Sequence, residues 1–206
     1  MRTCAFIDAS NLFYGGEKSL GWKIDYKKLL AYLKKKYLAS KVFYFGGVKS
    51  HNFPFNYLKE ETVPVVTLGK YLARIIAKEK DSLSEAKLIL FARHLQWARF
   101  YCKLQEFCYL LYLKPVKRYE QEDGTLRRKA NGDVEMTFRP MKEIKSFDRA
   151  IILSGDGDFL PVLRYIREIE KEKKRWSFLL VAQGRQKKSA NLPEAIFVTL
   201  SICASY

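Results

Sequence analysis

The sequence contains few of the residues that build zinc sites or disulfide frameworks. It has two histidines and four cysteines in 206 residues, and no two of the cysteines form a C-x-x-C pair. We therefore expect no zinc site, and the scattered cysteines indicate reduced thiols. Long uncharged stretches are also missing, which argues against a membrane-spanning helix, and the first residues form no apolar leader. These absences predict a cytoplasmic protein with no membrane partner.

Acidic residues are outnumbered by basic ones. The chain has 38 Lys and Arg against 22 Asp and Glu, which gives a formal net charge of +16. A surface with this charge attracts polyanions, and nucleic acid is the commonest polyanion in a cell. The simpler alternative is a basic protein whose lysines are only solvated. With 48% hydrophobic residues the chain can bury a substantial core, so disorder is not expected.

The hydrophobic pattern alternates between short apolar runs and amphipathic segments, which is typical of an α/β fold. Asp25 can cap a helix with an apolar face between Tyr26 and Tyr37, and Asp158 can cap another. The expected strands are 3–7, 42–45, 107–113, 150–153, 176–181 and 196–200, and a short helix is expected at 189–194. The pattern predicts a single domain over residues 1–206 with a parallel sheet sandwiched between helices.

The middle of the chain is expected to form a largely helical insertion at 51–105. Its first part has mixed signals, because two prolines interrupt any long element. Ser82 and Glu85 can form a capping box before an apolar helix over 86–104. Such a helix is compatible with a homodimer or protein-partner interface. The polar, basic residues 114–131 are expected to form a mobile loop.

Two of the predicted strands end in acidic residues. Asp8 follows the first strand, and Asp156 and Asp158 follow the strand at 150–153. Sites in open parallel sheets lie beyond the carboxyl ends of the strands, so neighbouring strands would bring these carboxylates together. Clustered carboxylates repel unless a cation neutralises them, and hard oxygen ligands suit Mg²⁺ or Mn²⁺. The structural alternative is that Asp8 only ends a strand and Asp158 only caps a helix.

Three motifs occur in a fixed order from one end of the chain to the other. Phe6–Leu12 contains D-x-x-N after an apolar strand, Lys129–Glu135 reads K-A-N-G-D-V-E, and Ser154–Phe159 reads S-G-D-G-D-F. Together these segments resemble the NYN domain family, the LabA-like branch of the PIN-like ribonuclease fold. The resemblance implies a Rossmann-like parallel sheet with an acidic pocket for Mg²⁺ or Mn²⁺, and hydrolysis of phosphodiester bonds, usually in RNA.

The resemblance also implies roles for individual residues. The acids that would hold the metal and act in catalysis are Asp8, Asp133, Asp156 and Asp158. Asn11 would position the substrate or a water, and Ser154 would support the pocket by hydrogen bonding. One departure from the family pattern is Pro140, which would kink or shorten the helix expected after Asp133.

Basic and aromatic side chains would contact single-stranded RNA. Tyr14, shortly after Asn11, is a candidate for stacking on a base. The candidates for phosphate contacts are Lys117, Arg118, Arg127, Arg128, Lys129, Arg185, Lys187 and Lys188. For any single one of these, an ordinary solvated charge is the simpler interpretation. The two histidines, His51 and His94, are assigned no role.

These features favour a metal-dependent ribonuclease, in which the cation would polarise a phosphoryl oxygen and activate a water for in-line attack. The main alternative is an RNA-binding regulatory protein of the same fold with little or no turnover. An aspartyl-phosphate phosphatase also begins with a strand that ends in aspartate. That chemistry needs a second acid two residues later, where this chain has Ser10.

Overall fold

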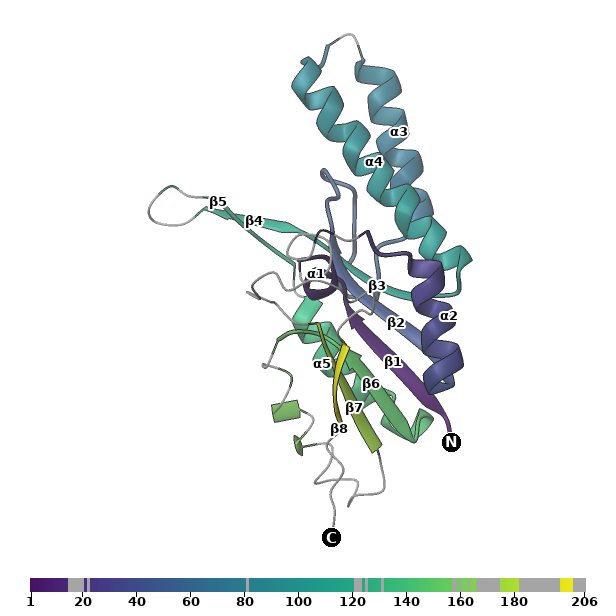
Figure 1. Cartoon of the computed structure of the whole chain (residues 1–206). Helices are drawn as coiled ribbons and strands as arrows, with labels where there is room; N and C mark the ends of the chain where they lie inside the picture. Colours follow the sequence, from purple (N-terminus) through teal and green to yellow (C-terminus); the bar gives the residue numbers. More distant parts are fainter. Residues whose placement is uncertain are drawn as a thin grey trace. The chain divides into compact units, whose positions relative to one another are not determined.

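A computed structural model gives the fold of the chain (Figure 1). It describes residues 1–14, 21, 23–80, 82–120, 124, 126–130, 132–156, 159, 161–162, 164–165, 175–181 and 197–201, and along 118–120, 126–129, 175–181 and 197–201 it describes the backbone. The chain divides into two compact units. The sheet unit comprises Met1–Phe45 and Asp133–Tyr206, and the middle unit comprises Gly46–Gly132.

The elements follow the alternation expected from the sequence. Those of the sheet unit are β1 (Thr3–Asp8), α1 (Ala9–Leu12), α2 (Tyr26–Tyr37), β2 (Ala39–Val48), α5 (Gly132–Lys142), the 3-10 helix η2 (Ile144–Ser146), β6 (Arg149–Leu153), β7 (Arg175–Val181) and β8 (Phe197–Ser201). Those of the middle unit are α3 (Val65–Glu79), α4 (Glu85–Glu106), β3 (Leu110–Pro115), β4 (Lys117–Glu120) and β5 (Leu126–Lys129). The last residues of β2 and the first residue of α5 belong to the middle unit.

Parallel pairing of apolar strands forms the centre of the sheet unit. The strand order is β2-β1-β6-β7-β8, and the first four of these strands run parallel. Every residue of β1 is buried, as expected for a strand that is covered on both faces. The predicted α/β fold with a parallel sheet between helices is confirmed. The last strand departs from it, because β8 pairs with β7 in the antiparallel direction.

Alternating side chains on β2 show which segment covers each face of the sheet. Tyr44 packs edge-to-face against Tyr26, with ring centroids 5.9 Å apart, so α2 covers one face (Figure 1). Phe43 stacks on Phe6 of β1 at 5.0 Å, and Phe147, which follows η2, packs on Phe6 at 5.8 Å. Because neighbouring residues of a strand point to opposite faces, this aromatic cluster covers the other face.

The helix α2 forms as its sequence predicts. The Asp25 side chain accepts a hydrogen bond from the backbone N–H of Lys28 at 3.0 Å, which satisfies a free donor at the helix start. The predicted apolar face is the buried one, and it consists of Tyr26, Leu29, Leu30, Leu33 and Tyr37. The helix ends at Leu38, which adopts a left-handed conformation with φ of 55°.

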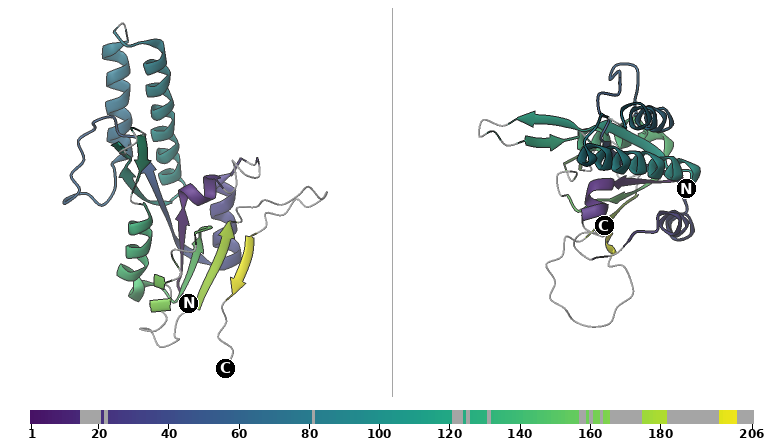
Figure 2. Two further views of the ribbon diagram at one scale, coloured as in Figure 1. Left: turned by 90° about the vertical axis from the view of Figure 1, so that its left-hand side faces the viewer. Right: turned by 90° about the horizontal axis from the view of Figure 1, so that it is seen from above.

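The middle unit is built on the helix pair α3 and α4, which lie side by side (Figures 1 and 2). The helix α3 was not expected, because Pro64 was taken to interrupt the segment. Pro64 is instead its N-cap, where a missing N–H is tolerated. Among the residues that the structure describes, no helix has both the length and the apolar composition to cross a bilayer.

The start of α4 differs from the predicted capping box. The helix begins at Glu85 after the N-cap residue Ser84, whose side chain makes no capping hydrogen bond. The Ser82 hydroxyl instead donates to the Glu79 carbonyl at 3.1 Å, so Ser82 serves the end of α3. Two serines two residues apart compete for the cap, and the sequence alone does not separate them.

The segment expected to be a mobile loop contains a β-hairpin. The strands β4 and β5 pair antiparallel from Lys117 opposite Lys129 to Glu120 opposite Leu126, and Gly124 between them has a φ of +74°. The charged residues concealed these strands, because Lys, Arg and Glu do not give the apolar alternation by which a strand is recognised.

The glycine pair after Phe45 does not end β2, as had been expected. A Cβ atom at Gly47 would lie 2.6 Å from the Ala130 Cβ and 2.9 Å from Val116 Cγ2. The absence of a side chain therefore lets the chain pass close to these residues inside the middle unit. The strand continues to Val48, whose carbonyl accepts the Val116 N–H at 2.9 Å.

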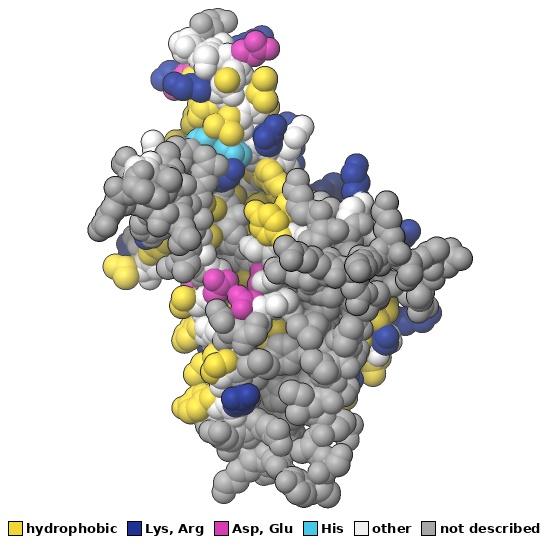
Figure 3. All heavy atoms as spheres, turned by 60° about the vertical axis from the view of Figure 1, so that its left-hand side comes forward, with side chains coloured by type: hydrophobic (Ala, Val, Ile, Leu, Met, Phe, Trp, Pro, Cys, Tyr) yellow, Lys and Arg dark blue, Asp and Glu magenta, His cyan; other side chains and the backbone are white. Residues whose placement is uncertain are grey.

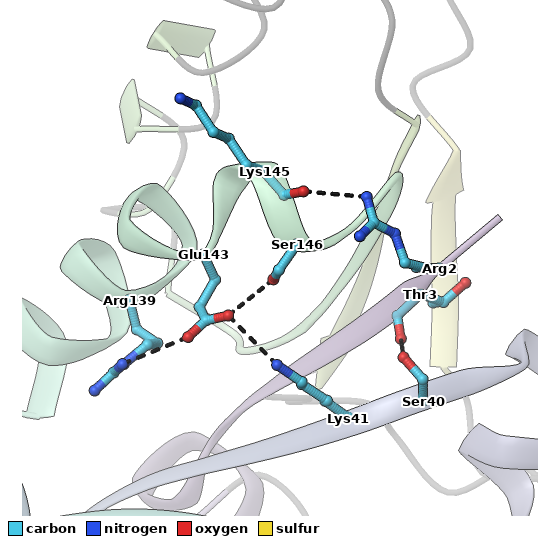
Figure 4. A network of polar contacts seen from close by, with 8 residues as sticks. All are labelled: Arg2, Thr3, Ser40, Lys41, Arg139, Glu143, Lys145 and Ser146. Carbon is cyan, nitrogen blue, oxygen red and sulfur yellow. Dashed lines mark hydrogen bonds and ion pairs between the residues drawn. The ribbon is translucent and has the colours of Figure 1, made fainter.

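Glu143 connects α5 and η2 to β2 in the sheet unit (Figure 4). Its carboxylate accepts the Ser146 hydroxyl at 2.8 Å, and lies 3.6 Å from Lys41 Nζ and 3.6 Å from Arg139 Nη1. The Ser146 hydrogen bond, with the nearby Lys41 and Arg139 cations, lowers the pKa of Glu143 against the opposing effect of burial. The helix α5 contains Pro140 and ends two residues after it, at Lys142.

Replacing Glu143 with Gln is expected to lower the free energy of unfolding by about 1–3 kcal/mol near pH 7, because hydrogen bonds to a charged group are lost. A lowered pKa in the folded protein means that this contribution is complete above the ordinary pKa of 4.5 and is lost as the pH falls through the folded value. Urea unfolding near pH 7 and about pH 3 should therefore show a difference between wild type and Glu143→Gln that shrinks in acid.

The matched control is Glu106→Gln, because the Glu106 side chain is 59% exposed beside Lys103. Its effect should stay below about 1 kcal/mol at either pH. An equal loss of stability by Glu143→Gln at both pH values would contradict the role given to its charge.

Candidate active site

The candidate site lies at the carboxyl ends of β1 and β6. These strands are parallel neighbours, with Phe6 opposite Ile152 and Ile7 opposite Leu153. The residues that follow, Asp8 and Ser154, therefore leave the sheet at the same edge. The expectation that the two acidic strand ends belong to adjacent strands is met for β1 and β6.

The Asp8 carboxylate is held by four hydrogen bonds, and the residue is only 6% exposed. Oδ1 accepts the backbone N–H groups of Ser10 at 2.9 Å and Asn11 at 3.1 Å. Oδ2 accepts the Asn11 side-chain amide at 2.5 Å and the Ser154 hydroxyl at 3.1 Å. Each carboxylate oxygen offers about two acceptor positions, so the protein itself fills the acceptor capacity of Asp8.

The spacing of the D-x-x-N signature has a structural cause. Asp8 is the N-cap of α1, and the backbone N–H groups that it accepts are those of the second and third helical residues. Asn11 is that third residue, so its side chain reaches back to the cap from one turn later. The structural role considered for Asp8 is therefore real, and it coexists with the position of Asp8 at the site.

Ser154 links the two acidic strand ends. Its hydroxyl donates to Asp8 Oδ2 at 3.1 Å and accepts the backbone N–H of Asp156 at 3.1 Å, and the residue is 0% exposed. One hydroxyl group thus holds both the Asp8 carboxylate and the backbone of the half-buried Asp156. Because both hydrogen bonds are buried or half-buried, they are shielded from competition by water.

The other two predicted acids are placed differently. Asp133 lies in the first turn of α5, as expected, and is exposed. Asp158 lies outside the described residues. Acidic side chains gather near the middle of the face shown in Figure 3. Among the residues that the structure describes, no three His, Cys, Asp or Glu side chains are grouped so that they could hold a metal ion.

The donor set nevertheless fits a hard divalent cation. The ligands available at this edge are carboxylates, with no histidine or cysteine among the residues described there, and such oxygen donors suit Mg²⁺ or Mn²⁺ rather than zinc. A cation at Asp8 would have to replace at least one of its present hydrogen-bond donors.

The residues expected to contact RNA fall into three groups. Tyr14 is 58% exposed, with its ring edge-to-face on Phe13 at 5.4 Å. Arg127, Arg128 and Lys129 form most of β5 in the middle unit. Those outside the described residues are Arg185, Lys187 and Lys188, and the short helix expected at 189–194 lies outside them as well.

Two features of the chain were missed from the sequence. The residues Lys41, Arg139 and Glu143 fix the end of α5, the helix that carries Asp133, and charged residues far apart in sequence give no signal that they will meet. His51 and His94, which were given no role, lie together in the middle unit with their rings 4.4 Å apart.

Replacing Ser154 with Ala is expected to lower the free energy of unfolding by about 1–3 kcal/mol, because it leaves buried polar groups of Asp8 and Asp156 without this partner. Urea denaturation measures this loss. Ser10→Ala is the matched control, since Ser10 is exposed and only its backbone N–H contacts Asp8. If the two variants were equally stable, the link through the Ser154 hydroxyl would have no energetic weight.

Comparison with solved structures finds distant similarities. A protein of unknown function from Vibrio parahaemolyticus is 16% identical, with a TM-score of 0.47, over 86% of this chain and 80% of that one. The T5 D15 protein co-crystallised with metal ions is 17% identical, with a TM-score of 0.42, over 86% of this chain and 54% of that one. T5 5'-exonuclease with bound zinc is 16% identical, with a TM-score of 0.42, over 86% and 55%.

The chain thus spans about half the length of the two T5 proteins. At these TM-scores and identities the likeness says nothing about substrate or activity. No curated protein matches the sequence. The sequence model of the NYN domain matches residues 2–200, and the chain therefore belongs to the NYN domain family.

Proposed function

We propose that this NYN domain is a metal-dependent ribonuclease that hydrolyses RNA phosphodiester bonds at the carboxyl ends of β1 and β6. The observation that carries the proposal is the Ser154 hydroxyl, which donates to Asp8 and accepts from the backbone of Asp156. A buried hydroxyl that holds two acidic strand ends together is a means of keeping carboxylates close despite their repulsion.

Asp8, Asp133, Asp156 and Asp158 would hold the cation, Mg²⁺ or Mn²⁺. When bound, such a cation polarises a phosphoryl oxygen and makes water a better nucleophile near neutral pH. Ser154 and Asn11 keep the Asp8 carboxylate in a fixed orientation, and Asn11 is close enough to position substrate. The N-terminal turn of α5, which carries Asp133, adds favourable partial charge for an approaching phosphate.

The β4–β5 hairpin would hold the RNA backbone. Its register sets Lys117 opposite Lys129 and Arg118 opposite Arg128. Like charges at directly opposite positions destabilise a strand pair, and an isolated two-stranded hairpin is only marginally stable. A polyanion would relieve this repulsion, and we propose single-stranded RNA as that polyanion, with Tyr14 as a stacking residue. The described cysteines are free, which favours the reducing cytoplasm as its location.

A second function is favoured by one observation. The protein fills the acceptor positions of Asp8 with its own donors, and no group of three metal ligands occurs among the described residues. This arrangement suits an RNA-binding regulatory protein that binds metal weakly and turns over slowly or not at all. Measurement of cleavage separates the two functions.

Asp156→Asn is expected to reduce manganese-dependent cleavage of labelled single-stranded RNA at least about a hundredfold, because it removes a charged ligand of the cation. Cleavage by the wild type should stop on addition of a chelator. Asp148→Asn is the matched control, because Asp148 precedes β6 at the opposite end of the strand, where the backbone N–H of Arg2 donates to it at 2.6 Å. Cleavage that survives in Asp156→Asn would exclude this site.

Tight RNA binding by the wild type without any cleavage would instead establish the regulatory function. Either result requires that Asp156→Asn and Asp148→Asn unfold at temperatures close to that of the wild type, which circular dichroism measures.

The double variant Arg127→Ala/Arg128→Ala is expected to weaken RNA binding several-fold and to lower the slope of log K against log salt by about 1–2, because it removes up to two phosphate contacts. Fluorescence anisotropy in the presence of a chelator measures binding without cleavage. Lys34→Ala/Lys35→Ala is the control, since both lysines are exposed in the last turn of α2. An unchanged salt slope in the hairpin variant would remove the hairpin from the RNA-binding surface.

A further inference from the structure

We propose that a cavity in the middle unit, beside His51, binds one nucleotide, held by its phosphate and its base. The cavity has a volume of about 550 Å³ and lies among the segment after β2, the helices α3 and α4, and the residue before β4. This volume falls in the usual range of small-molecule sites, about 300–1,000 Å³. The proposal extends the proposed function, since RNA is a source of nucleotides.

The wall at His51 is a strained turn that the surrounding helices hold in place. His51 and Asn52 have φ angles of 47° and 62°, a left-handed conformation that side chains other than glycine rarely adopt. The Tyr71 hydroxyl, from α3, donates to the His51 carbonyl at 2.9 Å. Consecutive residues in this conformation persist only where tertiary contacts fix them, and they are frequent at ligand sites.

The His51 ring is fixed from α4. It lies over the Phe91 ring with centroids 4.4 Å apart, and it contacts His94, which is 4% exposed. The only two histidines of the chain, 43 residues apart, therefore meet in one place. A cavity wall that is fixed in this way costs little ordering when a ligand binds.

The lining combines the features that a nucleotide requires. The Lys49 ammonium and the His51 imidazole supply donors for a phosphate, while Tyr71 and Phe91 supply aromatic surface for a base. Glu79 also lines the cavity, and its carboxylate disfavours a purely anionic ligand. It can instead accept hydrogen bonds from sugar hydroxyls or base amino groups. A ligand with one anionic end and several donors satisfies all of these groups.

The cavity also borders the start of the basic hairpin. Val116 lines it, and the next residue, Lys117, begins β4, with its ammonium 4.6 Å above the Tyr57 ring. A strand whose phosphates lie along the hairpin could therefore place one nucleotide in the cavity. The nucleotide is either part of an RNA strand or a free nucleoside monophosphate, and the experiment distinguishes these sources.

The test measures binding of adenosine and uridine monophosphate by calorimetry and of a short single-stranded RNA by anisotropy, both with chelator present. Lys49→Ala and Phe91→Leu are each expected to weaken binding about tenfold, the loss of one charge-assisted contact or one stacked base. Lys87→Ala is the control, because Lys87 is exposed on α4 and does not line the cavity. Phe91→Leu keeps an apolar side chain, and circular dichroism verifies folding.

Weaker binding of both probes by the two cavity variants, with Lys87→Ala unchanged, supports a site for nucleotides from either source. Weaker binding of RNA alone supports a site for a nucleotide within a strand. Unchanged binding of both probes by Lys49→Ala and Phe91→Leu, or a loss of equal size in Lys87→Ala, overturns the proposal. None of these outcomes depends on Asp8 or Asp156, so loss of the nucleotide site and failure of the ribonuclease proposal are separately visible.

Discussion

The parallel pairing of β1 with β6 is the constraint on which the candidate site depends. Two segments almost 150 residues apart in sequence end at one edge of the sheet because their strands are hydrogen-bonded side by side in the same direction. Burial of both strands on the two faces of the sheet fixes their register, since a shift by one residue would turn every apolar side chain to the wrong face. The contact of Ser154 with Asp8 and Asp156 follows from that register.

The parts of this fold that could be predicted are those in which local and tertiary preferences agree. The apolar run at Thr3–Ile7 and the cap at Asp25 each carry their own physical signal, and the structure matches both. The hairpin β4–β5 could not be predicted, because strands rich in Lys and Arg resemble a solvated loop. The adjacency of the acidic strand ends could be inferred from the parallel order, whereas no local pattern could bring Glu143 to Lys41 or His51 to His94. Those contacts depend on packing between elements.

The positive charge of the chain has a different cost in each unit. In the sheet unit, Lys41 and Arg139 are neutralised by Glu143 and help to fix α5 to β2. In the middle unit, the register of the hairpin sets basic residues opposite one another. A charge that is paired within the fold contributes to stability, whereas a charge set against its like lowers stability until an external anion is bound. This asymmetry favours the middle unit as the place where a polyanion is held.

Asp8 has to serve two purposes that compete for the same oxygens. As the N-cap of α1 it accepts two backbone N–H groups with Oδ1, and these bonds hold the helix start whether or not a cation is present. Oδ2 is bound by two side-chain groups, which can rearrange at lower cost than backbone. A cation would therefore be expected to compete at Oδ2, with the Asn11 amide or the Ser154 hydroxyl as the group displaced. The affinity for metal is then set by how readily that group gives way, and this quantity, more than the number of acids, decides between a nuclease and a binding protein of the same fold.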